Sequence, residues 1–487
     1  MQRLKSLLFE NQTLQQTVLK NTFWLTFGNM ASRLIRAVLI IYAARILGVA
    51  GYGVFSYALS IAGFFSIFAD VGITPLLTRE SARNPEERIH YLSTGLFIKF
   101  FFMLVSTLLI LFAAPLITKI EGAQELFGII VFLFAFDTLR DFFFGFTRSI
   151  EKMELEAGTN IATNLAILIL GGAALLFAPT SKMLTIGYTA GSGVGLVVLL
   201  LILKKYLRNV WRSFRSDLVK PIITQAWPFA LAGLLGTIML QTDMIMLGWF
   251  RGAEEVGFYS AAQKIILLLY LLPGFLAVSL FPSFSRLAST DKEKFRLILE
   301  KGISAAFLMA FPIAVGGIIL APQIINLIYG PAYLQSSTAF VILLFTLFFL
   351  SPGVFVGNAI FAYNRQKLFT SFVGLGTVSN VIFNFLLIPS YGIVGSALAT
   401  IGSQLLANGF IWNMMKKINN FKTLINLPKT LVAVFVMATA TFIFRVLGIN
   451  VVLNIAFSAV IYFAVLKILK EPLLEYVNPF RLFRNVT

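Results

Sequence analysis

The chain lacks cysteine altogether and has a single histidine among its 487 residues. Without cysteine it can form no disulfide, no thiolate metal site and no cysteine nucleophile. The one histidine, His90, falls at the end of a hydrophobic run, so histidine-based acyl transfer and metalloprotease chemistry are poorly supported. No Gly-x-x-x-x-Gly-Lys sequence occurs, which argues against transport driven by ATP hydrolysis in this chain. We therefore expect no metal site and no cofactor.

Charged residues are also scarce, at 12% of the chain, against about 25% in ordinary globular proteins. Hydrophobic residues make up 58% and recur in continuous runs from end to end. A helix needs about 20 apolar residues to cross the hydrocarbon core, and these runs do not alternate as the strands of a membrane barrel would. The polar N-terminal segment leads into a full-length run, so we expect no cleaved signal peptide. The sequence thus predicts an all-α polytopic membrane protein with about 14 transmembrane helices.

The positions of lysine and arginine predict the orientation of these helices. The predicted spans lie at 21–44, 54–77, 91–116, 124–147, 158–178, 184–203, 222–249, 257–282, 302–321, 338–362, 368–388, 393–414, 428–447 and 450–468. With the N-terminus inside, 29 lysines and arginines fall in inner loops or tails and 5 in outer loops. Such an excess is typical of cytoplasmic loops. We therefore expect a multi-pass protein of the cytoplasmic (inner or plasma) membrane with both termini in the cytoplasm.

The same loops account for the net charge of +18, which could otherwise suggest binding to nucleic acid. Cations beside membrane spans set topology and contact anionic headgroups. We expect membrane lipids as partners and no nucleic acid.

The sequence also contains an internal repeat of about 200 residues. The segment ILGVAGYGVFSYALS at 46–60 resembles MLGWFRGAEEVGFYSAAQ at 246–263, because each has Leu-Gly, a short outer loop and Gly-x-[Phe/Tyr]-Ser at the start of a span. Thr163-Asn164 matches Ser379-Asn380 in the same order. Six spans are an even number, so both repeats have the same orientation and are related by a pseudo-two-fold axis along the membrane normal, with a substrate path expected between them.

This repeat predicts the domain organisation. The predicted parts are an N-lobe at 1–210 (spans 1–6), a C-lobe at 217–416 (spans 7–12), two appended spans at 425–470 and a cytoplasmic tail at 471–487.

Several short motifs carry a resemblance to a known family. They are RILG at 45–48, GYGVFS at 51–56, DVGI at 70–73, VGFYSA at 256–261 and PSYGIVGSA at 389–397. Together they resemble Wzx-type polysaccharide-biosynthesis flippases of the multidrug/oligosaccharidyl-lipid/polysaccharide (MOP) exporter superfamily. The resemblance covers roughly residues 15–415, and its aliphatic-rich motifs specify the superfamily better than the substrate.

The resemblance implies two six-helix lobes around a central cavity that opens to each side of the membrane in turn. It also implies a cargo of oligosaccharide on a polyprenyl pyrophosphate, moved from the cytoplasmic to the outer leaflet without catalysis. Na+ or H+ as a coupling ion and glycan-assembly enzymes as partners are left open. The alternatives are an ion-coupled multidrug antiporter of the same superfamily and an intramembrane glycan-modifying enzyme.

Charges inside the predicted spans supply the candidate site residues, because a charge at this depth normally faces a bundle interior or a wet cavity. Asn29, Arg33 and Arg36 share one helical face by their spacing of four and three residues. Guanidinium groups match phosphate oxygens in bidentate fashion, so this face is a candidate pyrophosphate site. Its alternative is internal ion pairing with Asp70, which is also a candidate coupling-ion site.

The remaining intramembrane charges have two interpretations each. Lys264 is a further candidate for binding the phosphate or glycan, with Asp243 as its partner or as an ion-coupling site, and the alternative is a structural Lys–Asp pair.

Two other groups are expected to be structural. Asp137, Arg140 and Asp141 have the spacing of a structural network on one helix. Lys99 is expected to extend its amine to the cytoplasmic interface.

Overall fold

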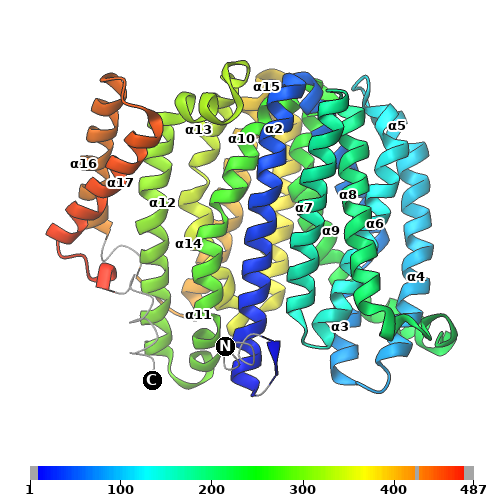
Figure 1. Ribbon diagram of the computed structural model, residues 1–487. Helices are drawn as coiled ribbons and strands as arrows, with labels where there is room; N and C mark the ends of the chain where they lie inside the picture. The colour runs from blue at the N-terminus through cyan, green and yellow to red at the C-terminus, as the bar shows by residue number, and fades with distance from the viewer. Residues whose placement is uncertain (1–8, 12, 423–426, 476–487) are drawn as a thin grey trace. The chain divides into compact units, whose positions relative to one another are not determined.

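The computed structural model describes residues 9–11, 13–422 and 427–475, and every regular element within those ranges is helical (Figure 1). The predicted all-α class is confirmed. Residues 476–487, most of the predicted tail, lie outside the described ranges, as do residues 423–426.

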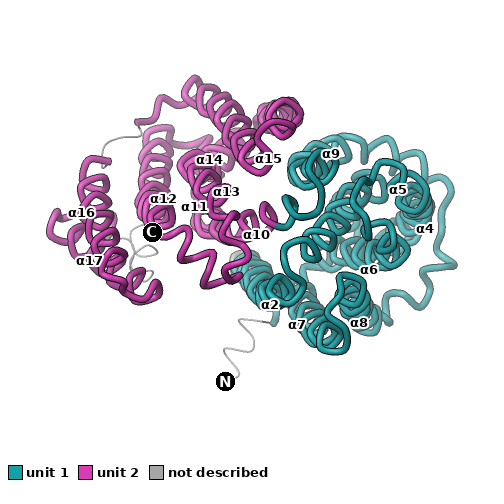
Figure 2. Tube along the Cα trace, turned by 90° about the horizontal axis from the view of Figure 1, so that it is seen from above, with its two compact units in different colours: residues 1–257 teal, residues 258–487 magenta. Residues whose placement is uncertain are grey.

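The chain divides into two compact units, residues 1–257 and 258–487 (Figure 2). The first unit contains α2 (Leu14–Asp70), α3 (Ile73–Arg83), α4 (Arg88–Leu108), the π-turn η1 (Leu109–Ala113), α5 (Ala114–Ile117), α6 (Ala123–Ser149), α7 (Met153–Phe177), α8 (Ser181–Leu207), the short 3-10 turns η2 (Val210–Arg212) and η3 (Ser216–Leu218), and α9 (Val219–Phe250). Helix α10 (Ala253–Leu269) begins in this unit and continues into the second. The lobe boundary predicted at 210–217 concerns the sequence repeat and stays a prediction.

The second unit continues with α11 (Leu271–Thr290), α12 (Lys292–Tyr329), the 3-10 turn η4 (Pro331–Tyr333), α13 (Ser336–Leu344), α14 (Leu347–Ala362), α15 (Gln366–Ile418), α16 (Leu427–Val446), α17 (Val451–Ile468) and the 3-10 turn η5 (Pro472–Glu475). Its core is built where α11, α12, α14 and α15 meet, around residues such as Phe284, Phe295, Phe355 and Met415.

Ten helices in the described residues are long and apolar enough to cross a membrane, and the bent pair α13 and α14 makes an eleventh. The chain is thus a multi-pass membrane protein. Two of these helices each extend across the junction of two predicted spans. Helix α2 bends at Gly48 (φ 68°) and α15 bends at Gly392 (φ 53°), in each case between the two predicted spans. Glycine allows both bends because positive φ is costly for residues with a Cβ. The predicted fourth span, α6, is not among the ten, since Asp137, Arg140 and Asp141 interrupt its apolar sequence.

One end of the first unit is shaped by the break between α2 and α3. Val71 (φ 41°) and Gly72 (φ 74°) are both in the left-handed region, so α3 leaves in a new direction directly after Asp70. Below this break Leu92, Phe142 and Leu199 join a buried cluster that fixes α4, α6 and α8 against α3. The break therefore brings polar residues of several helices to one place.

Candidate functional site

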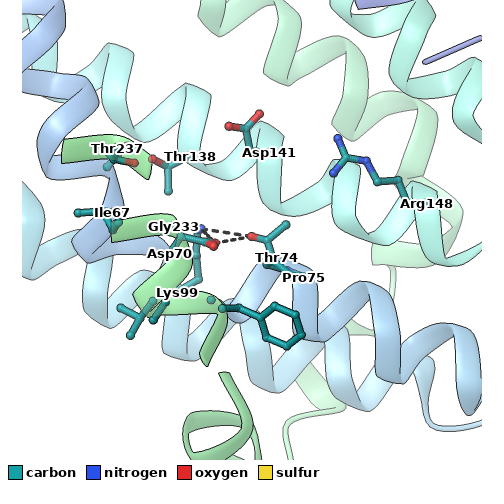
Figure 3. Close-up of a pocket in the computed structure, with 15 residues that line it drawn as sticks. Ile67, Asp70, Thr74, Pro75, Lys99, Thr138, Asp141, Arg148, Gly233 and Thr237 are labelled. Carbon is teal, nitrogen blue, oxygen red and sulfur yellow. Dashed lines mark hydrogen bonds and ion pairs between the residues drawn. The ribbon is translucent and has the colours of Figure 1, made fainter. Parts of the chain in front are cut away.

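A polar cavity of about 370 Å³ lies inside the first unit among α2, α3, α4, α6 and α9 (Figure 3). Its charged and hydroxyl-bearing lining residues are Ser66, Asp70, Thr74, Lys99, Thr138, Asp141, Arg148 and Thr237. Apolar walls are supplied mainly by Ile67, Val71 and Phe229. A polar cavity of this size holds several water molecules.

Lys99 and Asp70 form an ion pair at the wall of this cavity. The amine lies 2.5 Å from Asp70 Oδ1 and 3.5 Å from Thr74 Oγ1, while the Thr74 hydroxyl also donates to Asp70. Lys99 is 1% exposed, so the expectation that its amine extends to the interface is wrong. The break after Asp70 turns α3 so that Thr74, one turn later, bonds the same carboxylate. Asp70 is therefore paired with Lys99. The alternative interpretation, which paired Asp70 with Arg33 or Arg36, is wrong.

Asp141 faces the same cavity from α6 and lies apart from the Asp70–Lys99–Thr74 group (Figure 3). Among the described residues its carboxylate has no hydrogen bond and no ion pair. Arg148, further along α6, is held instead by Glu156 of α7 in a bidentate pair at 2.6 and 2.8 Å. Asp141 thus leaves a carboxylate open to the cavity.

Asp137 and Arg140 form the rest of the predicted network on α6. Their side chains are 2.7 Å apart, and the Ser192 hydroxyl of α8 accepts from Arg140 and donates to Asp137. Arg140 is buried, and its Nε has no partner in the described residues. The pair links α6 to α8, whereas Asp141, predicted in the same network, points to the cavity.

Arg33 and Arg36 lie on the exposed face of α2 that the spacing predicted, together with Asn29. Arg36 Nε donates to Asn164 Oδ1 of α7 at 2.8 Å, and its guanidinium lies 6.0 Å from the ring centroid of Tyr188 on α8. Arg33 and Asn29 have no hydrogen bond or ion pair among the described residues. From the sequence, Asn164 is recognisable only by its match to Asn380 in the repeat, and spacing along one helix does not show that it orients Arg36.

The structure therefore separates the four intramembrane cations of the first unit into two kinds. Lys99 and Arg140 are buried, and each is within 2.7 Å of a carboxylate. Arg33 and Arg36 are exposed, and in the part of the chain that the structure describes neither is in a salt bridge. Neither arginine is therefore neutralised by a carboxylate in the described residues.

The remaining predicted residues lie in helices on either side of the unit boundary. Asp243 is 3% exposed on α9 of the first unit, and Lys264 is half-buried on α10 in the second. Their pairing stays a prediction. In the second unit, Asn384 donates to Asn380 at 3.0 Å and Asn408 donates to Gln404 at 2.8 Å, so these amides bond one another along α15.

Two family models match the sequence. A model described as "polysaccharide biosynthesis protein" matches residues 18–288, and the MatE model matches residues 228–386. The first match covers more than half of the chain.

Individual relatives match over most of their length. A putative O-antigen transporter of Shigella flexneri is 25% identical over 402 residues, which are 79% of this chain and 94% of the relative. The probable flippase AglR of Haloferax volcanii is 28% identical over 402 residues, covering 79% and 80% of the two chains.

Solved structures share the fold. The lipid II flippase MurJ in an inward closed conformation superposes with a TM-score of 0.76 at 18% identity, over 92% of this chain and 98% of that one. An inward-facing multidrug resistance MATE transporter of the MOP superfamily gives a TM-score of 0.66 at 16% identity, over 81% and 94%. At these identities the likeness shows the fold alone.

Proposed function

Because the chain belongs to the polysaccharide biosynthesis protein family, we propose that it is a flippase for lipid-linked glycans. Relatives named as a putative O-antigen transporter, a probable flippase and a probable low-salt glycan biosynthesis flippase support this function. The cargo is an oligosaccharide on a polyprenyl pyrophosphate, moved from the cytoplasmic to the outer leaflet by alternating access. Transport, and not catalysis, is the activity of this chain.

The observation that carries the proposal is the pair of exposed arginines on α2. A cation within a membrane span is costly unless an anion or water compensates it. Lys99 and Arg140 have carboxylates for this purpose, but Arg33 and Arg36 have none in the described residues. A pyrophosphate supplies the missing negative charge and the oxygen atoms that two guanidinium forks bind best.

The neighbouring groups support the same role. Asn164 holds Arg36 by its Nε, which leaves the terminal nitrogens of the guanidinium for a ligand. Asn29, one turn before Arg33, adds an amide that can donate to a phosphate or a sugar hydroxyl. We assign Lys264 to the same cargo as a contact of the second repeat.

Residues around the polar cavity support cation coupling. The charged residues that line the cavity are Asp70, Asp141, Lys99 and Arg148, and Arg148 is paired with Glu156 of α7. Lys99 pairs with Asp70 and Arg148 pairs with Glu156, so Asp141 is the lining carboxylate that has no hydrogen bond or ion pair among the described residues. A carboxylate that faces a wet cavity within a membrane bundle can bind H+ or Na+. We therefore assign Asp141 as the candidate site for a coupling cation, with Asp243 as a second candidate.

The multidrug antiporter is the second candidate function, favoured by the MatE match at 228–386. A cationic drug prefers an acidic wall, whereas the exposed charges on α2 are basic. The glycolipid cargo therefore fits this chain better.

The decisive variant is Arg33→Ala with Arg36→Ala, reconstituted in proteoliposomes containing a fluorescent polyprenyl-pyrophosphate glycan. We expect transport to fall about tenfold or more, because each charge-assisted hydrogen bond contributes roughly 1.5–3 kcal/mol. The double variant Arg33→Lys with Arg36→Lys keeps both charges but loses the bidentate guanidinium geometry. Its transport rate should lie between those of the wild type and the double alanine variant.

Arg45→Ala, at the outer end of the same α2 segment, is the matched control and should leave the rate unchanged. Transport at the wild-type rate in the double alanine variant would remove these arginines from the site.

A further inference from the structure

The hairpin of α16 and α17 packs along α12 within the second unit (Figure 1 and Figure 2). Leu308 of α12 belongs to a buried cluster with Met437 of α16 and Leu466 of α17. Helix α12 is 38 residues long and has two prolines, Pro312 and Pro322, inside it. A proline has no amide hydrogen, so each one removes a hydrogen bond from the helix. In a membrane, a neighbouring element has to satisfy the carbonyl group that is left.

The hydroxyl of Tyr462 satisfies the carbonyl that Pro312 leaves. In an α-helix the amide of residue 312 would donate to the carbonyl of residue 308, four positions before it. Because residue 312 is proline, this donor is missing, and Tyr462 of α17 donates to the Leu308 carbonyl at 2.7 Å. Tyr462 is 2% exposed, so the bond is out of contact with solvent. The hairpin thus supplies the hydrogen bond that α12 loses at this proline.

A second contact lies at the other proline. Pro322 leaves the carbonyl of Ile318 without its helical donor. Arg445, in the last turn of α16, donates from Nη1 to the carbonyl of Ile319, the next residue of α12, at 2.6 Å. The guanidinium is a charged donor, and charge-assisted hydrogen bonds are among the stronger ones. Each helix of the hairpin therefore donates to α12 in the turn that precedes a proline.

The two helices of the hairpin are themselves joined by buried polar groups. Thr441 Oγ1 of α16 lies 2.7 Å from Ser458 Oγ of α17, and Ser458 donates to Asn454 Oδ1 at 3.1 Å. Asn454 in turn donates to the carbonyl of Thr441 at 3.1 Å. All three side chains are at most 5% exposed. A buried network whose members are paired fixes one arrangement of its helices. Tyr462 and Arg445 are therefore presented to α12 from a fixed frame.

We infer that the hairpin is a brace on α12, and that the Tyr462 hydroxyl fixes the bend of α12 at Pro312. Helices bend at proline because the missing hydrogen bond no longer holds their two halves in line. A donor bound to the freed carbonyl keeps one arrangement, and Arg445 adds a second support nearer the C-terminal end of α12. This role goes beyond the proposed function and does not depend on it.

The absence of cysteine makes a direct test possible, because spin labels can be attached at two chosen positions. Leu297→Cys with Asn326→Cys, both exposed on α12, places labels on either side of the prolines. The two positions are roughly 44 Å apart along a straight helix. Double electron–electron resonance on the purified full chain then measures the distribution of distances. Tyr462→Phe removes only the hydroxyl and should broaden this distribution. Tyr391→Phe, 60% exposed on α15, is the matched control and should leave it unchanged.

A proline variant makes the test specific to the proposed bond. In Pro312→Ala the amide of residue 312 can donate to the Leu308 carbonyl, so adding Tyr462→Phe should then have no effect. Arg445→Met should broaden the distribution with or without Pro312→Ala, because its acceptor is a different carbonyl. The inference is overturned if Tyr462→Phe leaves the parent distribution unchanged, or if it broadens the distribution equally in the parent and in Pro312→Ala.

Hydrogen exchange gives a second measurement that needs no proline variant. In Tyr462→Phe the amides of residues 309–316 should exchange about fivefold faster than in Tyr391→Phe, because one lost hydrogen bond shifts the local opening equilibrium by about that factor. Equal exchange of this segment in the two variants would show that the hydroxyl does not hold α12, and would overturn the inference.

Discussion

At the scale of single residues, charge pairing explains why one expectation from the sequence was wrong. Asp70 and Lys99 were both recognised as intramembrane charges, but they lie on different helices, and spacing along one helix cannot show a partner on another. The left-handed residues Val71 and Gly72, which turn α3 beneath Asp70, were equally invisible in the hydrophobic pattern. The face of Asn29, Arg33 and Arg36 was predictable because it depends on helical periodicity alone.

The ion pair predicts a specific loss of stability. Lys99→Met removes the cation and leaves the carboxylate of Asp70 unpaired among the helices of the first unit. We expect this change to lower the free energy of unfolding by about 3 kcal/mol. The double variant Lys99→Met with Asp70→Asn removes both charges and should recover most of that loss. Thermal unfolding of the purified variants measures both effects. A single variant as stable as the parent would contradict a structural role for the pair.

Asp141 predicts a dependence on cations. Asp141→Asn keeps the size of the side chain but removes the negative charge that we propose is neutralised by H+ or Na+. We expect transport by this variant to lose its response to a Na+ or pH gradient while folding is unchanged. Glu156→Gln is the comparison variant, because Glu156 is already paired with Arg148. We expect it to change the stability of the protein and to leave the response to the gradient unchanged. An unchanged gradient response in Asp141→Asn would place the coupling cation elsewhere.

At the scale of helices, the sequence predicted where helices lie better than where they end. The runs at 21–44 and 54–77 meet at the bend at Gly48, yet the chain stays helical through this region. The second run also crosses the end of α2 at Asp70 and continues into α3. Glycine in an apolar run signals a bend or a stop equally well, and only the packed structure decides between them. The charge-rich α6 was found because its apolar residues surround the charges on both sides.

Helix α12 begins with a cap whose strength depends on pH. Asp291 accepts hydrogen bonds from the amides of Glu293 and Lys294 at 3.1 and 3.0 Å. The amide of Lys294 and, to a smaller extent, its ammonium group hold the pKa of Asp291 below its ordinary value. Because the pKa of Asp291 is lower in the folded state, the ionised cap stabilises the fold fully above the pKa of the unfolded state, about 3.9. This stabilisation is lost as the pH falls through the pKa of the folded state.

The measurement compares wild type with Asp291→Ala in thermal unfolding between pH 7 and pH 3. We expect Asp291→Ala to unfold at a lower temperature at neutral pH, with the difference shrinking as the pH falls toward 3. A difference that is constant across this range would show that the carboxylate charge contributes nothing to the cap.

At the scale of the whole molecule, the loop charges predict which side each loop faces. Ser289→Cys, in the last turn of α11 between Arg286 and Lys292, should be cytoplasmic, and Glu121→Cys, beside Lys119, should be outside. In intact cells an impermeant maleimide should label only the second, and after permeabilisation it should label both. Labelling of Ser289→Cys in intact cells would reverse the orientation.

The central claim is that this fold carries an anionic lipid-linked glycan across a membrane. The most direct measurement uses the purified wild-type protein in vesicles that contain both a fluorescent polyprenyl-pyrophosphate glycan and an entrapped cationic dye. The account predicts that the glycan becomes accessible to a soluble reagent on the opposite leaflet while the dye stays inside. Release of the dye without movement of the glycan would contradict it and would assign the protein to drug export.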